Sequence, residues 1–440
     1  MTDNLLADLT QVLQNAQAGP VLGVRLRDWR AAVFRTQIIM LGIKNNIGGS
    51  VYTPPSYKNS ESAEIFLVWD DGKCSRAKLQ KPSESNGYHW KRELEFWRMA
   101  SFEDPFAVRI PHPAKLPEVA VASDEIRSII EGADRTAFDH QEKILSSRPR
   151  EAQTGANITA LWGKNSIYTS TGINIDYEES RYTVSWSFDS LIARGYAKRR
   201  LITGHEWQDI WNESASRYEI FKKQAEPVGQ NTCVILSPSV VEQMTEQYIL
   251  PNFSGENIFE GQSKFTLEDF RQKRKVFYEG ISLEIDPLRP YHWSSYLLTP
   301  EGVPASRTIL ASQGSLHSPY LNTKYALRWE TSPTAIPYGG GGIKITQEQQ
   351  VSWAQMLKEI DDGVLVLSVL GLHTQNPVTG SFSLAVPSGL RIKNGCLAGG
   401  VNVRISGNYW EILQSPDLVC GTSDLDNSPY FLTGCRCENI

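Results

Sequence analysis

The stretch from Leu370 to Asn408 constrains the fold of this chain more than any other segment. It reads LGLHTQNPVTGSFSLAVPSGLRIKNGCLAGGVNVRISGN, in which short apolar runs alternate with glycine, asparagine and proline. Near its end Val401, Val403 and Ile405 alternate with polar residues, a period of two that indicates a strand with one buried face. Turn-forming residues between such runs favour hairpins. The second half of the chain is therefore expected to be largely antiparallel β-structure.

The same stretch carries a set of spaced residues that resembles the C-terminal region of the TldD/PmbA family. The matching positions are Gly371, Asn376, Thr379, Gly380, Phe382, Ser383, Asn394, Gly395, Gly407 and Asn408. A second stretch, from Ile281 to Leu310, resembles the family's Asp-Pro, paired-serine and Glu-Gly-Val-Pro run. The resemblance implies an α+β fold, with an N-terminal α+β domain followed by a β-rich C-terminal domain.

The family pairs a zinc-peptidase subunit, TldD, with a metal-free partner, PmbA or TldE. In TldD-type subunits a helix supplies a His-Glu-x-x-x-His motif, and a Cys-Gly pair near the chain end supplies a third zinc ligand. The equivalent region here, Ser239 to Ser263, contains no histidine. Cys420 precedes Gly421 in a comparable place, without histidines beside it, and is only a weak metal candidate. The resemblance therefore implies the non-zinc subunit, with no catalytic residue and no cofactor in this chain and zinc in a TldD-like partner.

Length and composition agree with a soluble protein of more than one domain. The chain has 440 residues, 21% of them charged, and a formal net charge of -5, so it lacks the basic excess of most nucleic-acid-binding proteins. The N-terminus does not read as a signal peptide, and the longest apolar run is too short for a membrane span. Six scattered cysteines do not form a disulfide framework. We expect a cytoplasmic protein that binds neither nucleic acid nor membrane.

The apolar periodicity divides the chain into residues 1–226, possibly built from segments 1–112 and 113–226, and residues 227–440. Expected helices cover Asn4–Ala16, Glu206–Lys223, a segment capped by Ser239 with Glu242 as its capping-box partner, Leu267–Phe277 and Gln347–Ile360. Expected strands include Val21–Leu26, Ile65–Trp69 and Thr232–Leu236. The stretch 46–63 is expected to be a loop, and 104–117 a connector. Tyr182, Val184, Trp186 and Phe188 alternate with polar residues and predict one half-buried strand of a hairpin.

Several short motifs have a functional and a structural interpretation. His205-Glu206 begins like a zinc-peptidase helix, but the second-ligand position is Asp209 or Ile210, so a helix start is the simpler interpretation. Cys435 and Cys437 would share a strand face, yet two thiolates fall short of a structural zinc site. The glycine run 339–342 lacks the lysine of a phosphate-binding loop and is expected to be a flexible turn. Ser383 or Ser388 would need a distant histidine and acid to act as a nucleophile.

The leading hypothesis is a non-catalytic subunit that pairs with a TldD-like peptidase and encloses a chamber for unfolded or short peptides. Its candidate substrate-binding residues are His373, Asn376, Thr379 and Gly380, in a loop rich in hydrogen-bonding groups. The sequence does not decide whether the chain forms a homodimer in the absence of the partner. A self-contained hydrolase, with a site gathered from distant residues, is a second hypothesis. Modulation of a DNA topoisomerase is a third, favoured only by an older family name.

Overall fold

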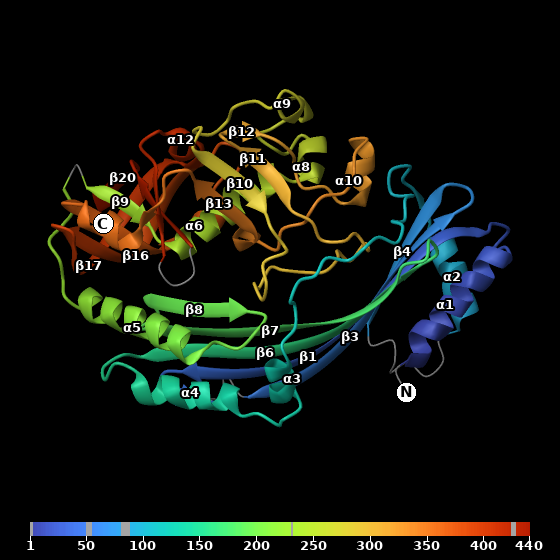
Figure 1. The fold of residues 1–440 in the computed structure, drawn as a ribbon, viewed down its shortest axis with the longest axis horizontal. Helices are drawn as coiled ribbons and strands as arrows, with labels where there is room; N and C mark the ends of the chain where they lie inside the picture. The colour runs from blue at the N-terminus through green and yellow to red at the C-terminus, as the bar shows by residue number, and fades with distance from the viewer. Residues whose placement is uncertain (1–2, 50–54, 81–88, 230–231, 424–427) are drawn as a thin grey trace.

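The computed structural model describes residues 3–49, 55–80, 89–229, 232–423 and 428–440 (Figure 1). It has an N-terminal lobe built on one long twisted sheet and a C-terminal lobe built on two further sheets. The architecture is α+β with largely antiparallel sheets, as the sequence predicts.

The sheet of the N-terminal lobe is antiparallel throughout its described pairs. In spatial order its strands are β5 (Phe102–Glu103), β4 (Lys73–Gln80), β3 (Ser56–Trp69), β1 (Leu26–Lys44), β6 (Thr154–Thr169), β7 (Asn174–Phe188) and β8 (Ile192–Lys198), with β2 (Ile47–Gly48) paired to β1. Strands β1, β6 and β7 run the length of the lobe, beneath the C-terminal lobe in Figure 1.

Two separate helical layers cover the ends of this sheet. The helices are α1 (Asp3–Ala18) and α2 (Trp90–Met99) at one end, and α3 (Asp124–Ile130), α4 (Thr136–Ser147) and α5 (Gly204–Phe221) at the other. Apolar residues of β1 and β3 pack under the first layer. Tyr182, Val184, Trp186 and Phe188 pack under the second, which confirms the half-buried strand that their alternation predicts. Between the two layers β1 is half-exposed along Arg35–Met40.

The C-terminal lobe combines a large mixed sheet with a small antiparallel one. The large sheet has the order β14 (Val351–Ser352), β18 (Val419–Thr422), β19 (Pro429–Thr433), β9 (Cys233–Leu236), β15 (Asp362–Leu370), β16 (Ser381–Lys393), β17 (Cys396–Asn408) and β20 (Arg436–Asn439). The small sheet has the order β12 (Ser315–Leu316), β11 (Thr308–Ser312), β10 (Ile281–Ile285) and β13 (Ile343–Gln347). Only β14–β18 and β9–β15 are parallel among the described pairs.

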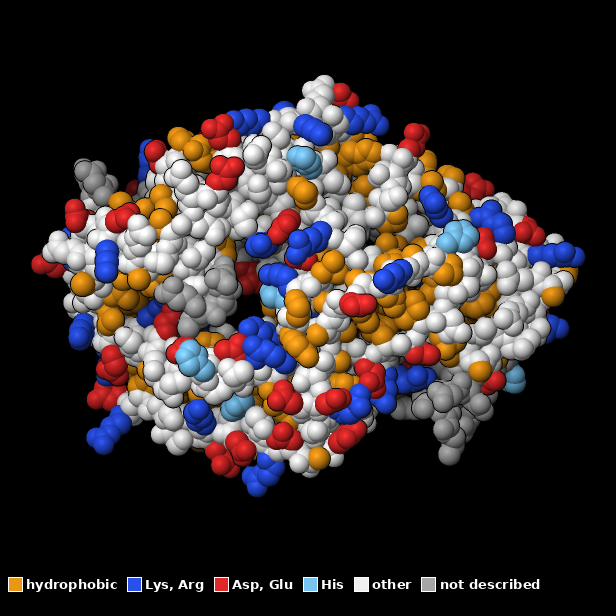
Figure 2. Space-filling view, in the orientation of Figure 1, with side chains coloured by type: hydrophobic (Ala, Val, Ile, Leu, Met, Phe, Trp, Pro, Cys, Tyr) orange, Lys and Arg blue, Asp and Glu red, His pale blue; other side chains and the backbone are white. Residues whose placement is uncertain are grey.

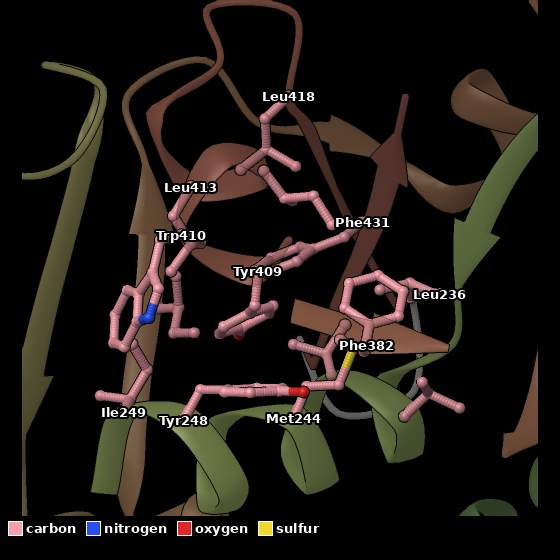
Figure 3. Packing of buried hydrophobic residues seen from close by; sticks show 14 of the residues in the cluster. Leu236, Met244, Tyr248, Ile249, Phe382, Tyr409, Trp410, Leu413, Leu418 and Phe431 are labelled. Atoms are coloured by element: carbon pink, nitrogen blue, oxygen red, sulfur yellow. The ribbon is translucent and has the colours of Figure 1, made fainter. Parts of the chain in front are cut away.

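The core of this lobe packs around one continuous helical segment. It consists of α6 (Pro238–Met244), a π-helical turn η1 (Thr245–Ile249) and α7 (Leu250–Asn252). Met244, Tyr248 and Ile249 point from it into a cluster with Phe382, Tyr409 and Phe431 (Figure 3). The rings of Tyr248 and Tyr409 stack with centroids 5.1 Å apart, and burial of such rings contributes a large share of core stability. Wide turns of this kind are often found at functional sites.

Short helices complete the C-terminal lobe. They are α8 (Gly255–Phe259), α9 (Leu267–Arg271), α10 (Thr323–Arg328), η2 (Gly340–Gly342), α11 (Trp353–Lys358), η3 (Leu372–Thr374) and α12 (Tyr409–Gln414). No helix of the described residues is long and apolar enough to cross a membrane.

The structure corrects several segment boundaries. The expected loop 46–63 was wrong over its second part, where β3 begins at Ser56; residues 50–54 lie outside the described part. The expected strand Val21–Leu26 reduces to a bridge between Val21 and Val24, and the helix from Leu267 ends at Arg271, because Lys273 adopts a φ of 50°. The helix expected over Gln347–Ile360 is shorter: β13 ends at Gln347, β14 follows at Val351–Ser352, and α11 covers Trp353–Lys358.

Candidate functional site

A cleft of about 1690 Å³ separates the two lobes. Figure 2 shows it as a hollow left of centre, with lysine and arginine side chains beside it. Its floor is formed by β6, β7 and β8, and its opposite wall by α6, the glycine run and the segment Arg289–Trp293. A cleft between two lobes is a common location for a ligand site.

The edge strand of the N-terminal sheet lies inside this cleft. β8 is the last strand in the sheet order, and residues Ala193–Lys198 line the cleft. Described residues cover the end of this edge: Lys198 bridges to His292, and the Arg199 N–H donates to the Tyr291 carbonyl at 2.9 Å. An edge strand has backbone N–H and C=O groups without a strand partner on one side. The cleft therefore presents a backbone template for an extended chain.

Two carboxylates at the cleft, Glu206 and Glu213, are each paired with two cations of the protein. Glu206 accepts from Arg200 Nη2 at 2.6 Å and from Lys198 Nζ at 2.9 Å. Burial alone would raise the pKa of Glu206, but the hydrogen bonds from Arg200, the Thr203 N–H and Lys198 outweigh it and hold the pKa well below its ordinary value. Glu213 pairs in the same way with Arg194 and Arg217. These two carboxylates are thus neutralised within the protein.

The His205-Glu206 pair begins α5, as its structural interpretation predicts. Thr203 is the N-cap, and its side chain forms a capping box with Glu206. The exposed His205 ring places Nδ1 2.8 Å from Asp209 Oδ2, but Glu206 is occupied by its cations. The two residues therefore form the start of a helix, and the described residues near them do not complete a metal site.

The start of α6 differs from the expected capping box. Ser237, not Ser239, is the N-cap, and Pro238 occupies the first turn, where its missing N–H costs nothing. The Ser239 hydroxyl instead donates to the Leu367 carbonyl at 3.3 Å. Glu242 is therefore not a capping partner; it lies in the cleft wall.

The glycine run packs against this helix and is not the flexible turn that we expected. Gly340 and Gly342 are buried in η2. A Cβ on Gly340 would lie 2.3 Å from the Glu242 carbonyl oxygen, and one on Gly341 would lie 2.3 Å from Glu242 Oε1. Only glycine allows the two backbones to approach this closely. The run holds the Glu242 carboxylate in place at the cleft wall.

The helix that lines the cleft lacks the ligands of a zinc motif. The segment from Ser239 to Ser263, to which it belongs, contains no histidine, and a His-Glu-x-x-x-His zinc site needs two. In the part of the chain that the structure describes, no group of three or more histidine, cysteine, aspartate or glutamate side chains is arranged to hold a metal ion.

Comparisons with known proteins agree with this geometry. Residues 229–434 match the family model described as the PmbA/TldA metallopeptidase C-terminal domain. An uncharacterized protein of Methanocaldococcus jannaschii is 23% identical over 359 residues, 79% of this chain and 82% of that protein. A metalloprotease PmbA homolog of Buchnera aphidicola is 22% identical over 306 residues, 67% of this chain and 64% of that protein. Residues 229–434 belong to the TldD/PmbA family.

Solved structures show the same fold over the whole chain. TldE from Thermococcus kodakarensis superposes with a TM-score of 0.75 at 18% identity, covering 99% of this chain and 100% of that one. A protein of Thermotoga maritima described as a putative modulator of a DNA gyrase gives the same TM-score, identity and coverage. At such low identity these matches establish the TldD/PmbA fold, and function has to be argued from the site.

Cys420, the weak metal candidate of the family comparison, is buried in the C-terminal core. Burial raises the pKa of its thiol to about 12, so the thiolate that binds metal is strongly disfavoured. Burial likewise raises the pKa of Cys435 and of Cys437 to about 11. The three thiols therefore behave as small core side chains in this structure.

Two of the predicted substrate-binding residues, Asn376 and Gly380, stabilise the turn of the loop that contains them. Asn376 Oδ1 accepts from the N–H groups of Val378 at 2.8 Å and Thr379 at 3.3 Å. Gly380 has a φ of +75°, and a Cβ there would lie 2.2 Å from Trp410 Cδ1. His373 is exposed on η3. None of the four lines the cleft of this chain, so their role toward a substrate stays a prediction that concerns an assembled complex.

The serines considered as nucleophiles lie apart from any base among the described contacts. Ser388 is fully buried and shares a 2.5 Å hydrogen bond with Ser368. The histidine–serine contact that the structure does contain joins His292 Nδ1 to Ser294 Oγ at 2.8 Å within one tight turn. His292 faces the cleft, but the buried Ser294 is not among its lining residues. No observation favours a self-contained hydrolase.

Sequence reasoning missed the part of the cleft that belongs to the N-terminal lobe. Residues 193–198 of β8 read ARGYAK and alternate too weakly to mark a binding edge. Their place at the edge depends on the order of the strands, which the apolar pattern does not encode. The hairpin pattern of β6 and β7 was the signal that could have indicated β8, because a third antiparallel strand can follow such a hairpin.

Proposed function

We propose that this chain is the non-catalytic, TldE-like subunit of a two-subunit peptidase of the cytoplasm. The observation that carries the proposal is that α6 forms a wall of the cleft and that the segment from Ser239 to Ser263 contains none of the histidines that a His-Glu-x-x-x-His zinc site needs. A TldD-like partner would supply zinc and the hydrolytic chemistry. This chain would contribute structure and a binding surface for the peptide.

The substrate class follows from the cleft. Glu206 and Glu213 are already paired with cations of the protein, so these two carboxylates are not free to bind a cationic ligand. Its open feature is the backbone of β8, which recognises an extended chain through main-chain hydrogen bonds and largely ignores side-chain identity. Unfolded or short peptides have this chemistry, whereas a duplex nucleic acid calls for a basic surface.

Two measurements test the subunit role. Purified alone, the chain is expected to contain no stoichiometric zinc by elemental analysis and to cleave no peptide. Mixed with a TldD-like homologue, it should form a 1:1 complex by light scattering, through an interface above about 1,000 Å². About one zinc per isolated chain that is lost on Cys420→Ser, or two separate species at micromolar concentration, contradicts the proposal.

A third measurement tests the peptide surface. A photoreactive extended peptide should crosslink within residues 193–198 of the complex. The same peptide with alternate amides N-methylated, which removes backbone donors along one edge, should bind about tenfold more weakly. Equal binding of both peptides would contradict backbone pairing with β8 and leave the subunit role untouched.

A further inference from the structure

A second, smaller cavity lies at the other contact between the lobes. Its volume is about 350 Å³. Its floor is formed by β1, β3 and β4, at the end of the sheet away from the peptide cleft, and its roof is Glu301 with the first residues of α10. It shares no lining residue with the cleft.

Three adjacent strands place two arginines on either side of one phenylalanine in this cavity. Arg30 of β1 stands opposite Phe66 of β3, and Phe66 stands opposite Arg76 of β4. Directly opposite residues share a face of the sheet. Each guanidinium carbon lies 5.5 Å from the centroid of the Phe66 ring, which is within cation–π range. We call this row the Arg–Phe–Arg ladder.

Positive charge exceeds negative charge around the ladder. Five cationic and two anionic side chains line the cavity, in a chain whose net charge is -5. Lys78 pairs with Glu64 at 3.1 Å, and Lys324 pairs with Asp104 at 2.8 Å. The remaining cations are all arginines: Arg30, Arg76 and Arg109.

These arginines have no carboxylate partner of their own. Within the described ranges, none forms a salt bridge at 4.0 Å or less. Glu301 faces the cavity, but its Oε2 already accepts from the Thr323 N–H at 2.8 Å and the Thr323 hydroxyl at 2.6 Å. Burial, and to a lesser extent the charge of Arg76, lowers the pKa of Arg30, while Glu301 and Glu64 raise it in part. Like charges held together in a partly dehydrated site are destabilising unless an anion joins them.

We propose that this cavity binds a small dianion, a phosphate group or a dicarboxylate, between Arg30, Arg76 and Arg109. Guanidinium groups offer paired N–H donors whose geometry matches both kinds of oxyanion. The ring of Phe66 lies within cation–π range of two of them and offers their N–H groups no hydrogen-bond acceptor. Volume limits the ligand to a small molecule or one terminal group of a larger one. This site is separate from the proposed peptide surface and does not depend on it.

Calorimetric titration of the full chain with pyrophosphate and with succinate tests the proposal at low and at high salt. Arg76→Gln should weaken binding about tenfold, which corresponds to about 1.4 kcal/mol. Arg92→Gln, at an exposed arginine of α2, is the matched control and should leave affinity unchanged. Glu301→Gln keeps an acceptor for Thr323 but removes an opposing charge, so it should tighten binding several-fold. Added salt should weaken wild-type binding.

The pattern of results decides the proposal and its ligand. Binding of pyrophosphate alone assigns the site to phosphate groups, and binding of succinate alone assigns it to dicarboxylates. Absence of binding by both probes at millimolar concentration overturns the proposal. It is also overturned if Arg92→Gln weakens binding as much as Arg76→Gln does, or if Glu301→Gln weakens binding while its thermal unfolding matches wild type.

Discussion

The two cavities between the lobes differ in how their charged side chains are paired. Beside the large cleft, Glu206 and Glu213 each pair with two cations of the protein, while Arg181 and Arg289 line it without a salt bridge among the described residues. In the small cavity, Arg30 and Arg76 flank Phe66 and Arg109 lines the wall, and none of the three forms a salt bridge among the described residues. Cations that the protein does not neutralise favour an anion. The small cavity combines such cations with a volume that fits one small ligand, whereas the cleft combines them with an open strand edge.

The largest expected effect concerns the wall of the cleft. Gly340→Ala would place a Cβ 2.3 Å from the Glu242 carbonyl oxygen, so the backbone of η2 or α6 has to move. We expect a loss of about 2–3 kcal/mol in the free energy of unfolding, measured by urea denaturation. Gly434→Ala, at an exposed position where a Cβ meets nothing within 4 Å, is the control and should stay within about 0.5 kcal/mol. Equal stabilities would show that the glycine run moves freely.

The pairing within the cleft predicts a dependence on pH. The pKa of His292 is lowered to about 3 by burial and by the nearby Arg289, Lys198 and Arg199, with Asp286 opposing. The unfolded chain binds this proton below the ordinary pKa of 6.5, so stability should fall as pH drops from about 6.5 towards 3. Wild type should lose about 1–2 kcal/mol more than His292→Gln between pH 7 and 4.5.

Chemical denaturation at a series of pH values checks this expectation. His317→Gln, at an exposed histidine, serves as the control and should follow the wild-type pH profile. A His292→Gln profile parallel to wild type would mean that His292 exchanges its proton as it does in the unfolded chain.

Glu206 also makes stability fall as pH drops, but over a lower pH range than His292 does. Its pKa lies below the ordinary 4.5 in the folded chain, so its contribution is present above about 4.5 and is lost as pH falls below that value. Glu206→Gln should cost about 1 kcal/mol at pH 7, because the pair is partly exposed and water screens it. The difference in free energy of unfolding between wild type and Glu206→Gln should be smaller at pH 3 than at pH 7. Glu219→Gln on the exposed face of α5 should show no such difference from wild type at either pH.

The smallest expected effect separates turn building from substrate binding in the loop 373–380. Asn376→Ala removes the acceptor of two backbone N–H groups and should cost about 1 kcal/mol. His373→Ala, at an exposed side chain, should stay within about 0.5 kcal/mol. If the loop contacts peptide in the complex, His373→Ala should nevertheless lower peptide turnover at matched complex concentration. Unchanged turnover would confine the loop to a structural role.

The C-terminal lobe was the more predictable half of the fold. Its strand β17 packs one face on the core and exposes the other, so the period-two pattern of Val401, Val403 and Ile405 survives in the sequence. In the N-terminal lobe, Arg35–Met40 of β1 are half-exposed on both faces and carry no such alternation. The start of β3 is polar and exposed and therefore reads as a loop.

The candidate sites were harder to predict than the fold. The missing histidines of α6 are visible in the sequence, because a zinc helix needs its ligands close together along the chain. The Arg–Phe–Arg ladder needs residues 30, 66 and 76 in register across three strands, and no local pattern encodes that register. The extent of α9 was overestimated because apolar spacing continues past Arg271, where the backbone turns at Lys273.

The position of β8 also bears on solubility. An open sheet edge on a protein surface invites pairing with the edge of another folded molecule, which leads to aggregation. Here the edge lies inside the cleft and carries Arg194 and Lys198, and its last residue is covered by His292. Another folded sheet would have to bring its own edge between the two lobes to reach β8, whereas a single extended strand needs the space of one strand only. If β8 binds peptide as we propose, the enclosure of this edge would select chains by their lack of structure.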